Sequence, residues 1–414
     1  MKFEMKFDFT AGEDFLRNTA MSEFGNPAAK TLFEQEEIEV ETFKNALRIG
    51  KRADGKDYFI SLKEIHRQVL VGKTRCGKTF NMRRMSDLFY HSGYAVIHLC
   101  DLFNEMITSN QPLQTKFQRF LPKGEFPVGV PVKVYRPAIF KDLPQGNIKY
   151  QLGWGDLTEA DIMIFCGIDG RAVEAQTAIL QNFPKATGLI HFINLIKNEK
   201  IRAQTKNRII TKLQFLIDYE FIGDKWNADI IEDMEQGNVV VIHLEGYKKW
   251  EKSSPYLYQL PVINILRRIA EARKTGKLSK RTVIFIDEAA KMIPKRKEGE
   301  LKEEILDNVD MTAKLGIFMI FASQLEDGIP DSILDQSRYL WFPYSINSVD
   351  AVNLLARKQH YDFHPAYKRD LLRQLLDLKP TPDGRLPWVI IDDTKKTVWK
   401  VFPYPPLSNH KESL

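Results

Sequence analysis

One stretch of the chain has the residue types and spacing of a phosphate-binding loop. An apolar run ends at Gly72, and Gly77, Lys78 and Thr79 follow after four intervening residues, which is the spacing of a P-loop. Glycine leaves room for backbone N–H groups to converge on phosphate oxygens. The helix expected after the loop directs its positive end to the same place. We therefore expect an ATP site lined by Gly72, Thr74, Arg75, Cys76, Gly77, Lys78, Thr79 and Phe80.

Two side chains of this loop have expected roles in phosphate chemistry. Lys78 would place its charge on the β- and γ-phosphates, and Thr79 would give its hydroxyl oxygen to Mg²⁺. Cys76 reads as a small residue that fits the loop, with a redox switch as the less favoured interpretation. A chance match in a turn rich in glycine and lysine is the alternative to the whole motif.

A second stretch carries two adjacent carboxylates. Residues 281–286 form a buried-type strand that ends in Asp287 and Glu288. In P-loop ATPases a strand of this kind ends at the phosphate site, where Asp287 would hold Mg²⁺ and Glu288 would act as the general base on water. The alternative is a strand that stops at an ordinary acidic helix cap. Together, the two motifs indicate hydrolysis of a nucleoside triphosphate.

A third polar group follows another buried strand. Residues 317–321 are apolar and are followed by Ala322, Ser323 and Gln324. A polar side chain at the carboxyl end of a strand, beside the phosphate site, is where a sensor of the γ-phosphate belongs. We therefore predict that Gln324 takes part in catalysis.

Composition describes an ordinary globular protein. The chain has 414 residues, of which 43% are hydrophobic and 28% charged, with a formal net charge of +6 that permits a polyanionic partner without requiring one. Its 3 cysteines show neither metal spacing nor a disulfide framework, so we expect a reducing, cytoplasmic location. There is no run of about 18 apolar residues and no apolar signal core at the N-terminus, so we expect no membrane span.

Strands and helices alternate along most of the chain, which predicts an α/β fold with a mostly parallel sheet. The N-terminal part has an alternating pattern at residues 3–9 that predicts a strand. Residues from Asp156 onward are rich in helix signals and contain a basic run, 197–208, which is either a solvated helix face or a phosphate contact. The last strands, near 389–391 and 397–401, predict a hairpin or sheet edge, and the proline-rich tail is expected to be extended or mobile.

The predicted parts are an N-terminal β-containing extension (1–48), the first part of the ATPase core (49–155), a helical insertion (156–235), the rest of the core (236–402) and a tail (403–414).

The order of these motifs resembles the HerA/FtsK superfamily of P-loop ATPases, whose members are hexameric DNA pumps. The resemblance covers about Ile49 to Asn347. The most specific part is the run Ala322-Ser323-Gln324 with the apolar pairs and the glutamine that follow it. The matching segments are 66–74, 96–105, 237–244, 287–294 and 322–336.

The resemblance implies a RecA-like P-loop core, ATP and Mg²⁺ as ligands, and an ATPase that drives double-stranded DNA through a homo-hexameric ring. DNA processing, transfer and genome packaging are the tasks it suggests, with a nuclease or channel as a further partner. Many relatives carry an arginine shortly before the Gln-bearing strand, where this chain has none, so Lys314 and Arg338 are the candidates for a cation in its place. An arginine finger from a neighbouring subunit is not located in the sequence, and a lysine is not equivalent to an arginine in that role. A secretion, pilus-assembly or protein-remodelling ATPase and a nucleotide switch are the alternative functions.

Overall fold

The computed structural model describes residues 45–63, 66–73, 76–100, 109–138, 147–168, 172–218, 220–223, 229–244, 259–293, 307, 309, 311–312, 314–324, 328–343, 378–381, 385–395 and 397–409. The chain divides into two compact units, Met1–Arg48 with Phe59–Lys63, and Ile49–Tyr58 with Glu64–Leu414. The second unit contains all of the predicted site residues. The predicted strand at 3–9 lies outside the described residues.

Twelve strands form one sheet, in the order β2-β1-β14-β13-β12-β3-β11-β10-β4-β9-β5-β6. Pairing is parallel from β12 through β3, β11, β10, β4, β9 and β5 to β6, and antiparallel between β12, β13, β14 and β1. The predicted α/β class with a mostly parallel sheet is therefore confirmed. The strands are β1 (Ala46–Arg52), β2 (Asp57–Ser61), β3 (Arg67–Val71), β4 (Ala95–Cys100), β5 (Val132–Pro137), β6 (Asn147–Tyr150), β9 (Val239–His243), β10 (Thr282–Ile286), β11 (Ile317–Ser323), β12 (Ser337–Pro343), β13 (Trp388–Asp392) and β14 (Thr397–Pro403).

The central strands are buried along their whole length because both faces of the sheet are covered. Every residue of β3, β9, β10 and β11 is buried, which is the pattern of parallel strands with helices on both sides. The helices are α3 (Lys78–His91), α4 (Thr115–Gln118), α5 (Glu159–Cys166), α6 (Val173–Asn182), α7 (Leu189–Asn198), α8 (Ala203–Asp218), α9 (Ile230–Glu235), α10 (Gln259–Lys274), α11 (Ala289–Met292) and α13 (Asp331–Asp335). A separate small sheet joins β7 (Leu152–Gly153) to β8 (Ile222–Gly223).

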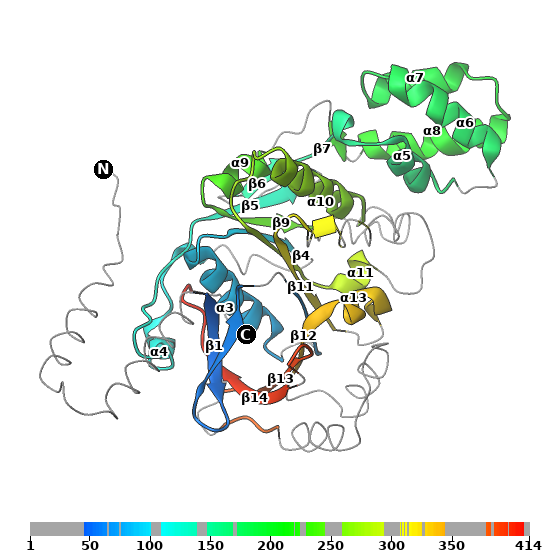
Figure 1. The fold of residues 1–414 in the computed structure, drawn as a ribbon. Helices are drawn as coiled ribbons and strands as arrows, with labels where there is room; N and C mark the ends of the chain where they lie inside the picture. The colour runs from blue at the N-terminus through cyan, green and yellow to red at the C-terminus, as the bar shows by residue number, and fades with distance from the viewer. Residues whose placement is uncertain are drawn as a thin grey trace, which may run out of the picture. The chain divides into compact units, whose positions relative to one another are not determined.

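The C-terminal hairpin lies inside the sheet. β13 pairs with both β12 and β14, and β14 pairs in turn with β1, so the red C-terminal strands of Figure 1 lie beside the blue first strand. The hairpin was predicted, but the alternative position at a sheet edge is wrong, because β13 and β14 each have a strand on both sides. The sequence also predicts two amphipathic helices, near 349–358 and 367–378, and these segments lie almost entirely outside the described residues.

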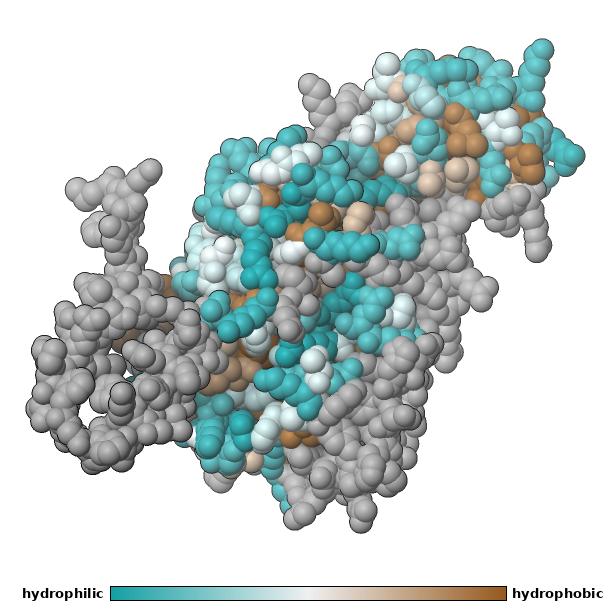
Figure 2. All heavy atoms as spheres, viewed as in Figure 1, coloured by the Kyte–Doolittle hydropathy of each residue, from teal (hydrophilic) through white to brown (hydrophobic). Residues whose placement is uncertain are grey.

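The predicted helical insertion contains α5 to α8, whose buried side chains form an apolar cluster around Phe165, Ile179, Phe192 and Leu213. Arg267 and Arg268 of α10 reach this region, pairing with Asp161 at 2.6 Å and with Asp156 at 3.1 Å. Figure 2 shows hydrophobic side chains among hydrophilic ones on the visible face of these helices. Exposed large apolar residues here are Val173, Leu180 and Ile190. Single exposed apolar side chains are common on protein surfaces.

None of the helices in the described part of the chain is both long and apolar enough to cross a membrane.

Candidate active site

The P-loop begins where β3 reaches the carboxyl edge of the sheet. The N–H of Gly72 donates to the carbonyl of Ser323 at 3.0 Å, so the loop starts beside the end of β11. A Cβ at Gly72 would lie 2.5 Å from Pro343 Cγ and 2.7 Å from Cys76 Sγ, which leaves no room for a side chain. Gly77, with φ 92°, precedes the first residue of α3, and this left-handed conformation favours glycine. Thr74 and Arg75 lie outside the described residues.

Lys78 is folded back over the loop that it follows. Its ammonium donates to the carbonyl of Gly72, and lies 3.4 Å from the carbonyl of Lys73. The side chain is buried. Because phosphate oxygens carry charge and are stronger acceptors than backbone carbonyls, a bound nucleotide could take over this ammonium without a large movement of the lysine.

Cys76 is enclosed in the loop. It is buried and not in a disulfide, and burial raises the pKa of its thiol. A neutral thiol is a poor nucleophile, which agrees with its interpretation as a small residue that fits the loop.

The two carboxylates lie at the same edge, two strands away from the P-loop strand. β10 pairs in parallel with β11, and β11 with β3, so at about 4.8 Å per strand the acidic turn is about 10 Å from the end of β3. The N–H of Asp287 donates to the carbonyl of Leu99 at 2.9 Å, which anchors the turn to β4. Both carboxylates are largely buried.

Glu288 has a strained backbone. Its φ of 53° and ψ of 42° are left-handed, a conformation that costs about 1–2 kcal/mol for a residue with a Cβ. The Asp287 carboxylate accepts the Glu288 N–H at 3.0 Å and holds the turn in this form. Strain of this kind is found where a side chain must be aimed, and here the aimed side chain is the predicted general base.

Gln324 lies between the loop and the acidic turn. It follows β11, and its side-chain amide donates to the Glu288 carboxylate. The structure therefore brings the predicted sensor and the predicted base into direct contact. It also brings Lys78, Asp287, Glu288 and Gln324 to the carboxyl ends of the neighbouring strands β3, β11 and β10, while their catalytic roles stay predictions.

The residues predicted to hold Mg²⁺ offer suitable donors. Thr79 supplies a hydroxyl and Asp287 a carboxylate, and oxygen atoms are the ligands that Mg²⁺ prefers. The described residues contain no group of three or more His, Cys, Asp or Glu side chains that could hold a metal. Two protein oxygens fit a cation that completes its shell with phosphate and water.

Arg338 is not near the P-loop of its own chain. β12 runs parallel to β3, with Ser337 opposite Arg67 and Tyr339 opposite Gln68, so Arg338 lies toward the amino end of β3 and the P-loop follows the other end. Its guanidinium pairs with Asp392 at 3.2 Å, and both side chains are largely buried. Lys314, the other candidate cation, is exposed. Delivery of either to a neighbouring subunit stays a prediction.

Sequence reasoning missed the C-terminal wall of the loop. A Cβ at Gly77 would lie 3.8 Å from Leu386 Cδ1 and 3.8 Å from Trp388 Nε1. Trp388 begins β13 opposite Pro343, which also faces Gly72. These residues lie more than 250 positions after the P-loop, by their numbers, and no local pattern connects them with it.

No protein-family model and no curated protein matches the sequence. Among solved structures, VirB4 of Thermoanaerobacter pseudethanolicus aligns at 13% identity with a TM-score of 0.58, covering 87% of this chain and 96% of that one. The genome packaging NTPase B204 from Sulfolobus turreted icosahedral virus 2, in complex with ATP-gammaS, aligns at 10% identity with a TM-score of 0.37, covering 82% and 98%. The bacterial conjugative coupling protein TrwBdeltaN70 aligns at 12% identity with a TM-score of 0.49, covering 84% and 88%.

The similarity to VirB4 concerns the fold. This chain has an α/β architecture with a RecA-like core, and that is what the two structures share. The TM-scores for B204 and TrwBdeltaN70 are too low to add to this argument.

Proposed function

We propose that this chain is an ATPase that moves double-stranded DNA through a ring of identical subunits, as a HerA/FtsK-like motor in DNA processing, transfer or genome packaging. The observation that carries the hydrolytic part is the arrangement of Lys78, the pair Asp287 and Glu288, and Gln324 at one edge of the sheet. This arrangement combines a cation for phosphate, a carboxylate for metal, and a base already contacted by an amide.

Hydrolysis on this site is a matter of positioning and charge. Lys78 would exchange its carbonyl partners for phosphate oxygens, and the backbone N–H groups of the loop would hold the phosphates. Glu288, aimed by its strained backbone, would orient water and accept its proton. Mg²⁺, held by Thr79 and Asp287, would supply positive charge against the phosphate oxygens. Because the Gln324 amide donates to Glu288, a bound nucleotide that moves this amide would also change the hydrogen bonding of the base.

A cation from a neighbouring subunit would link hydrolysis to ring assembly. Such a group typically changes the rate by about 10³–10⁵-fold. Within the chain, the Arg338 guanidinium forms an ion pair with Asp392. To reach the nucleotide of a neighbouring subunit, Arg338 would have to break this pair or bind both groups at once.

DNA would be contacted through its backbone phosphates, which makes binding tolerant of sequence and sensitive to salt. The candidates are Lys200, Arg202 and Lys206 of the helical insertion, together with Lys295, Arg296 and Lys297, which lie outside the described residues. Arg202 is exposed and pairs with Glu174 at 3.8 Å. An exposed ion pair of this length contributes little, so a phosphate could compete for the guanidinium.

A secretion-type or protein-remodelling ATPase is the second candidate. It would use the same nucleotide site, and two of the basic residues offered for DNA already have partners within the chain, since Lys206 donates to the carbonyl of Lys197 at 2.9 Å and Arg202 pairs with Glu174. The two functions differ in what stimulates hydrolysis.

The test is ATP hydrolysis with and without linear double-stranded DNA, at low and high salt, beside a Glu288→Gln variant. We expect DNA to stimulate hydrolysis, salt to weaken the stimulation, and Glu288→Gln to abolish hydrolysis while nucleotide still binds. Hydrolysis that ignores DNA at both salt concentrations would reject the DNA motor and favour the protein-moving ATPase. Hydrolysis that survives in Glu288→Gln would reject this site.

A further inference from the structure

The P-loop helix α3 is buried on two sides. On one side, the hydroxyl of Ser86 lies 2.9 Å from His98 Nε2 on β4, and the ring of Phe89 packs against Phe285 of β10 and Phe318 of β11. On the other side, α3 presents three ionisable residues, Arg83, Arg84 and Asp87, which are at most 1% exposed. Charged residues are rarely buried to this extent unless they are paired.

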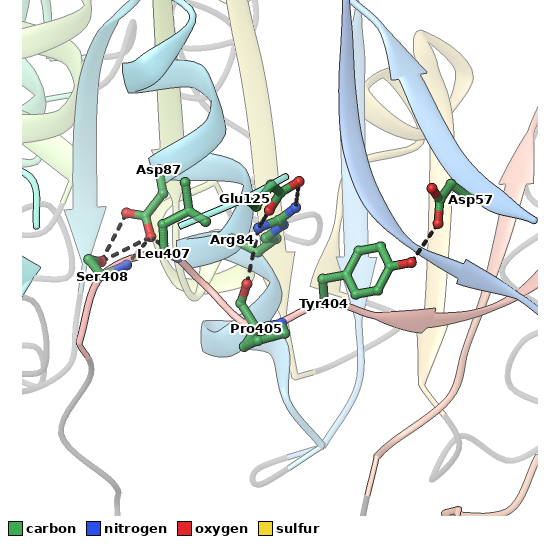
Figure 3. A network of polar contacts seen from close by, with 8 residues as sticks. All are labelled: Asp57, Arg84, Asp87, Glu125, Tyr404, Pro405, Leu407 and Ser408. Carbon is green, nitrogen blue, oxygen red and sulfur yellow. Dashed lines mark hydrogen bonds and ion pairs between the residues drawn. The ribbon is translucent and has the colours of Figure 1, made fainter. Parts of the chain in front are cut away.

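The partner of these charges is the segment after β14, residues 404–409, which we call the strap. Figure 3 shows Asp87 facing Ser408 and the backbone of Leu407, and Arg84 between Glu125 and Pro405. The Asp87 carboxylate accepts the N–H groups of Leu407 and Ser408, each at 2.8 Å, and lies 3.0 Å from the Ser408 hydroxyl. One buried carboxylate therefore binds two consecutive backbone donors.

The two arginines bind backbone acceptors of the same strap. Arg84 donates to the carbonyl of Pro405 at 3.2 Å and pairs with Glu125 at 2.6 Å. Arg83 donates to the carbonyl of Asn409 at 2.8 Å. The strap is thus recognised by its main chain, with carbonyls facing arginine and N–H groups facing aspartate. A slip by one residue would either bring Pro406, which has no N–H, to Asp87 or move the Ser408 hydroxyl away from it, so the contacts favour one register between strap and helix.

The far side of the strap is also fixed. The carbonyl of Leu407 accepts the N–H groups of Leu113 at 3.0 Å and Val128 at 2.9 Å, and the N–H of Asn409 donates to Gln111 at 2.7 Å. The hydroxyl of Tyr404 donates to Asp57 (Figure 3). A segment held on this side cannot follow α3 if the helix slides, so it can serve as a fixed support.

These contacts bear on the phosphate site because α3 is a short rigid rod. Lys78 and Thr79 are in its first turn, and Asp87 lies about 13 Å along the axis at about 1.5 Å per residue. On the sheet side α3 is held by ring packing and the Ser86–His98 contact, whereas on the other side buried charged groups bind the strap, and removing one partner of such a contact is strongly destabilising. Displacement of a reacting group by about 1 Å can cost about 10²-fold in rate.

We propose that Asp87 is a positioning residue for ATP hydrolysis: by holding the strap at Leu407 and Ser408, it fixes α3 along its axis and so places Lys78 and Thr79 at the phosphates. This inference rests on the proposed ATPase function. Burial raises the pKa of the Asp87 carboxyl, while the backbone and hydroxyl donors of Ser408, the charge of Arg83 and the N–H of Leu407 lower it. The strap is therefore its main source of stabilising donors.

The test compares Asp87→Leu with a matched control, Asp161→Leu. Asp161 is likewise buried, accepts a backbone N–H, from Thr158 at 2.8 Å, and pairs with an arginine, but it lies in the helical insertion. For each variant, the melting temperature, the Kd for a fluorescent ATP analogue, and kcat and KM for ATP are measured well below melting. Both variants should have a lower melting temperature than the wild type. Asp87→Leu alone should lower kcat at least tenfold and weaken nucleotide binding severalfold.

Two further variants keep the proposal falsifiable. Asp87→Asn can still accept the two N–H groups and should recover most of kcat. If Asp87→Leu does not fold, Ser408→Ala takes its place as the test: it removes the hydroxyl contact to Asp87, leaves α3 unaltered, and should reduce kcat. The inference is overturned if Asp87→Leu has a lower melting temperature but keeps Kd and kcat within twofold of the wild type. The same outcome for Ser408→Ala overturns it where Ser408→Ala is used in place of Asp87→Leu. If the wild-type chain binds nucleotide without hydrolysing it, the proposed function fails, and the change in Kd alone decides for or against the strap.

Discussion

His98 provides a test of how tightly α3 is joined to the sheet. Its imidazole stacks on Phe285 with ring centroids 4.4 Å apart, lies 2.9 Å from the Ser86 hydroxyl, and is 4% exposed. Burial, with a smaller contribution from the charge of Arg83, lowers its pKa from the ordinary 6.5 to about 3. The ring therefore connects the P-loop helix to the acidic strand as a neutral group.

The sign of the pH effect follows from this lowered pKa. Below pH 6.5 the unfolded chain takes up a proton at His98 that the folded chain does not take up until about pH 3, so stability is complete above 6.5 and is lost as the pH falls. One proton corresponds to about 1.4 kcal/mol per pH unit. Between pH 6.5, where half of the unfolded chains already carry this proton, and about pH 4.5, His98 should therefore lower the free energy of unfolding by about 2 kcal/mol.

The assay is denaturant unfolding at a series of pH values for the wild type and for His98→Phe and His98→Gln. Both variants remove the titrating group, but phenylalanine keeps the ring and glutamine keeps a polar group for Ser86. We expect that in both variants the free energy of unfolding falls by about 2 kcal/mol less over this pH range than it does in the wild type. An unchanged pH dependence in both variants would refute the buried neutral histidine, and a change in one of them alone would assign the effect to packing.

Three further predictions concern the site. Gln324→Leu removes the donor to Glu288 and should lower ATP hydrolysis by at least about tenfold while nucleotide binding persists. Hydrolysis at the wild-type rate would show that the contact between Gln324 and Glu288 does not contribute to catalysis. Gly77→Ala meets no steric block, because neighbouring atoms stay 3.8 Å away, so its left-handed φ alone should cost about 1–2 kcal/mol in unfolding and weaken nucleotide binding; unchanged melting would contradict this. Arg338→Met removes the cation beside the buried Asp392 carboxylate, which still accepts the N–H groups of Thr394 and Lys395, and should cost about 3 kcal/mol, measured by denaturant unfolding. Adding Asp392→Leu should restore stability but not hydrolysis, and recovered hydrolysis would contradict a role for Arg338 in trans.

The chemistry of the site could be predicted from the sequence because its signals are local. The P-loop spacing around Gly72 and Gly77, and the acidic pair after an apolar run, each lie within a few residues. The strand runs were predictable for a similar reason, since a strand covered on both faces reads as a nearly continuous apolar run. The predicted strands at the centre of the sheet all occur, with ends that differ by a few residues.

The order of the strands could not be predicted in this way. The strand that follows the P-loop helix, β4, lies three places from β3, with β11 and β10 between them. An apolar run pairs equally well with many partners, and long-range packing selects among them. That selection decides that Gln324 stands between Lys78 and Glu288, and therefore that it contacts the base.

The C-terminal part of the chain is where local reasoning was least informative. The tail was expected to be extended or mobile, and residues 404–409 are extended but packed: Ser408 is fully buried. Its backbone groups bind Arg83, Arg84 and Asp87 of the P-loop helix, which lie more than 300 positions earlier in the sequence. Thus the sequence by itself determined the phosphate loop, the acidic pair and the class of fold, because those depend on neighbours along the chain. The tertiary structure alone decided the contact to Glu288, the wall at Trp388 and the strap on α3, because each joins residues that only long-range packing brings together.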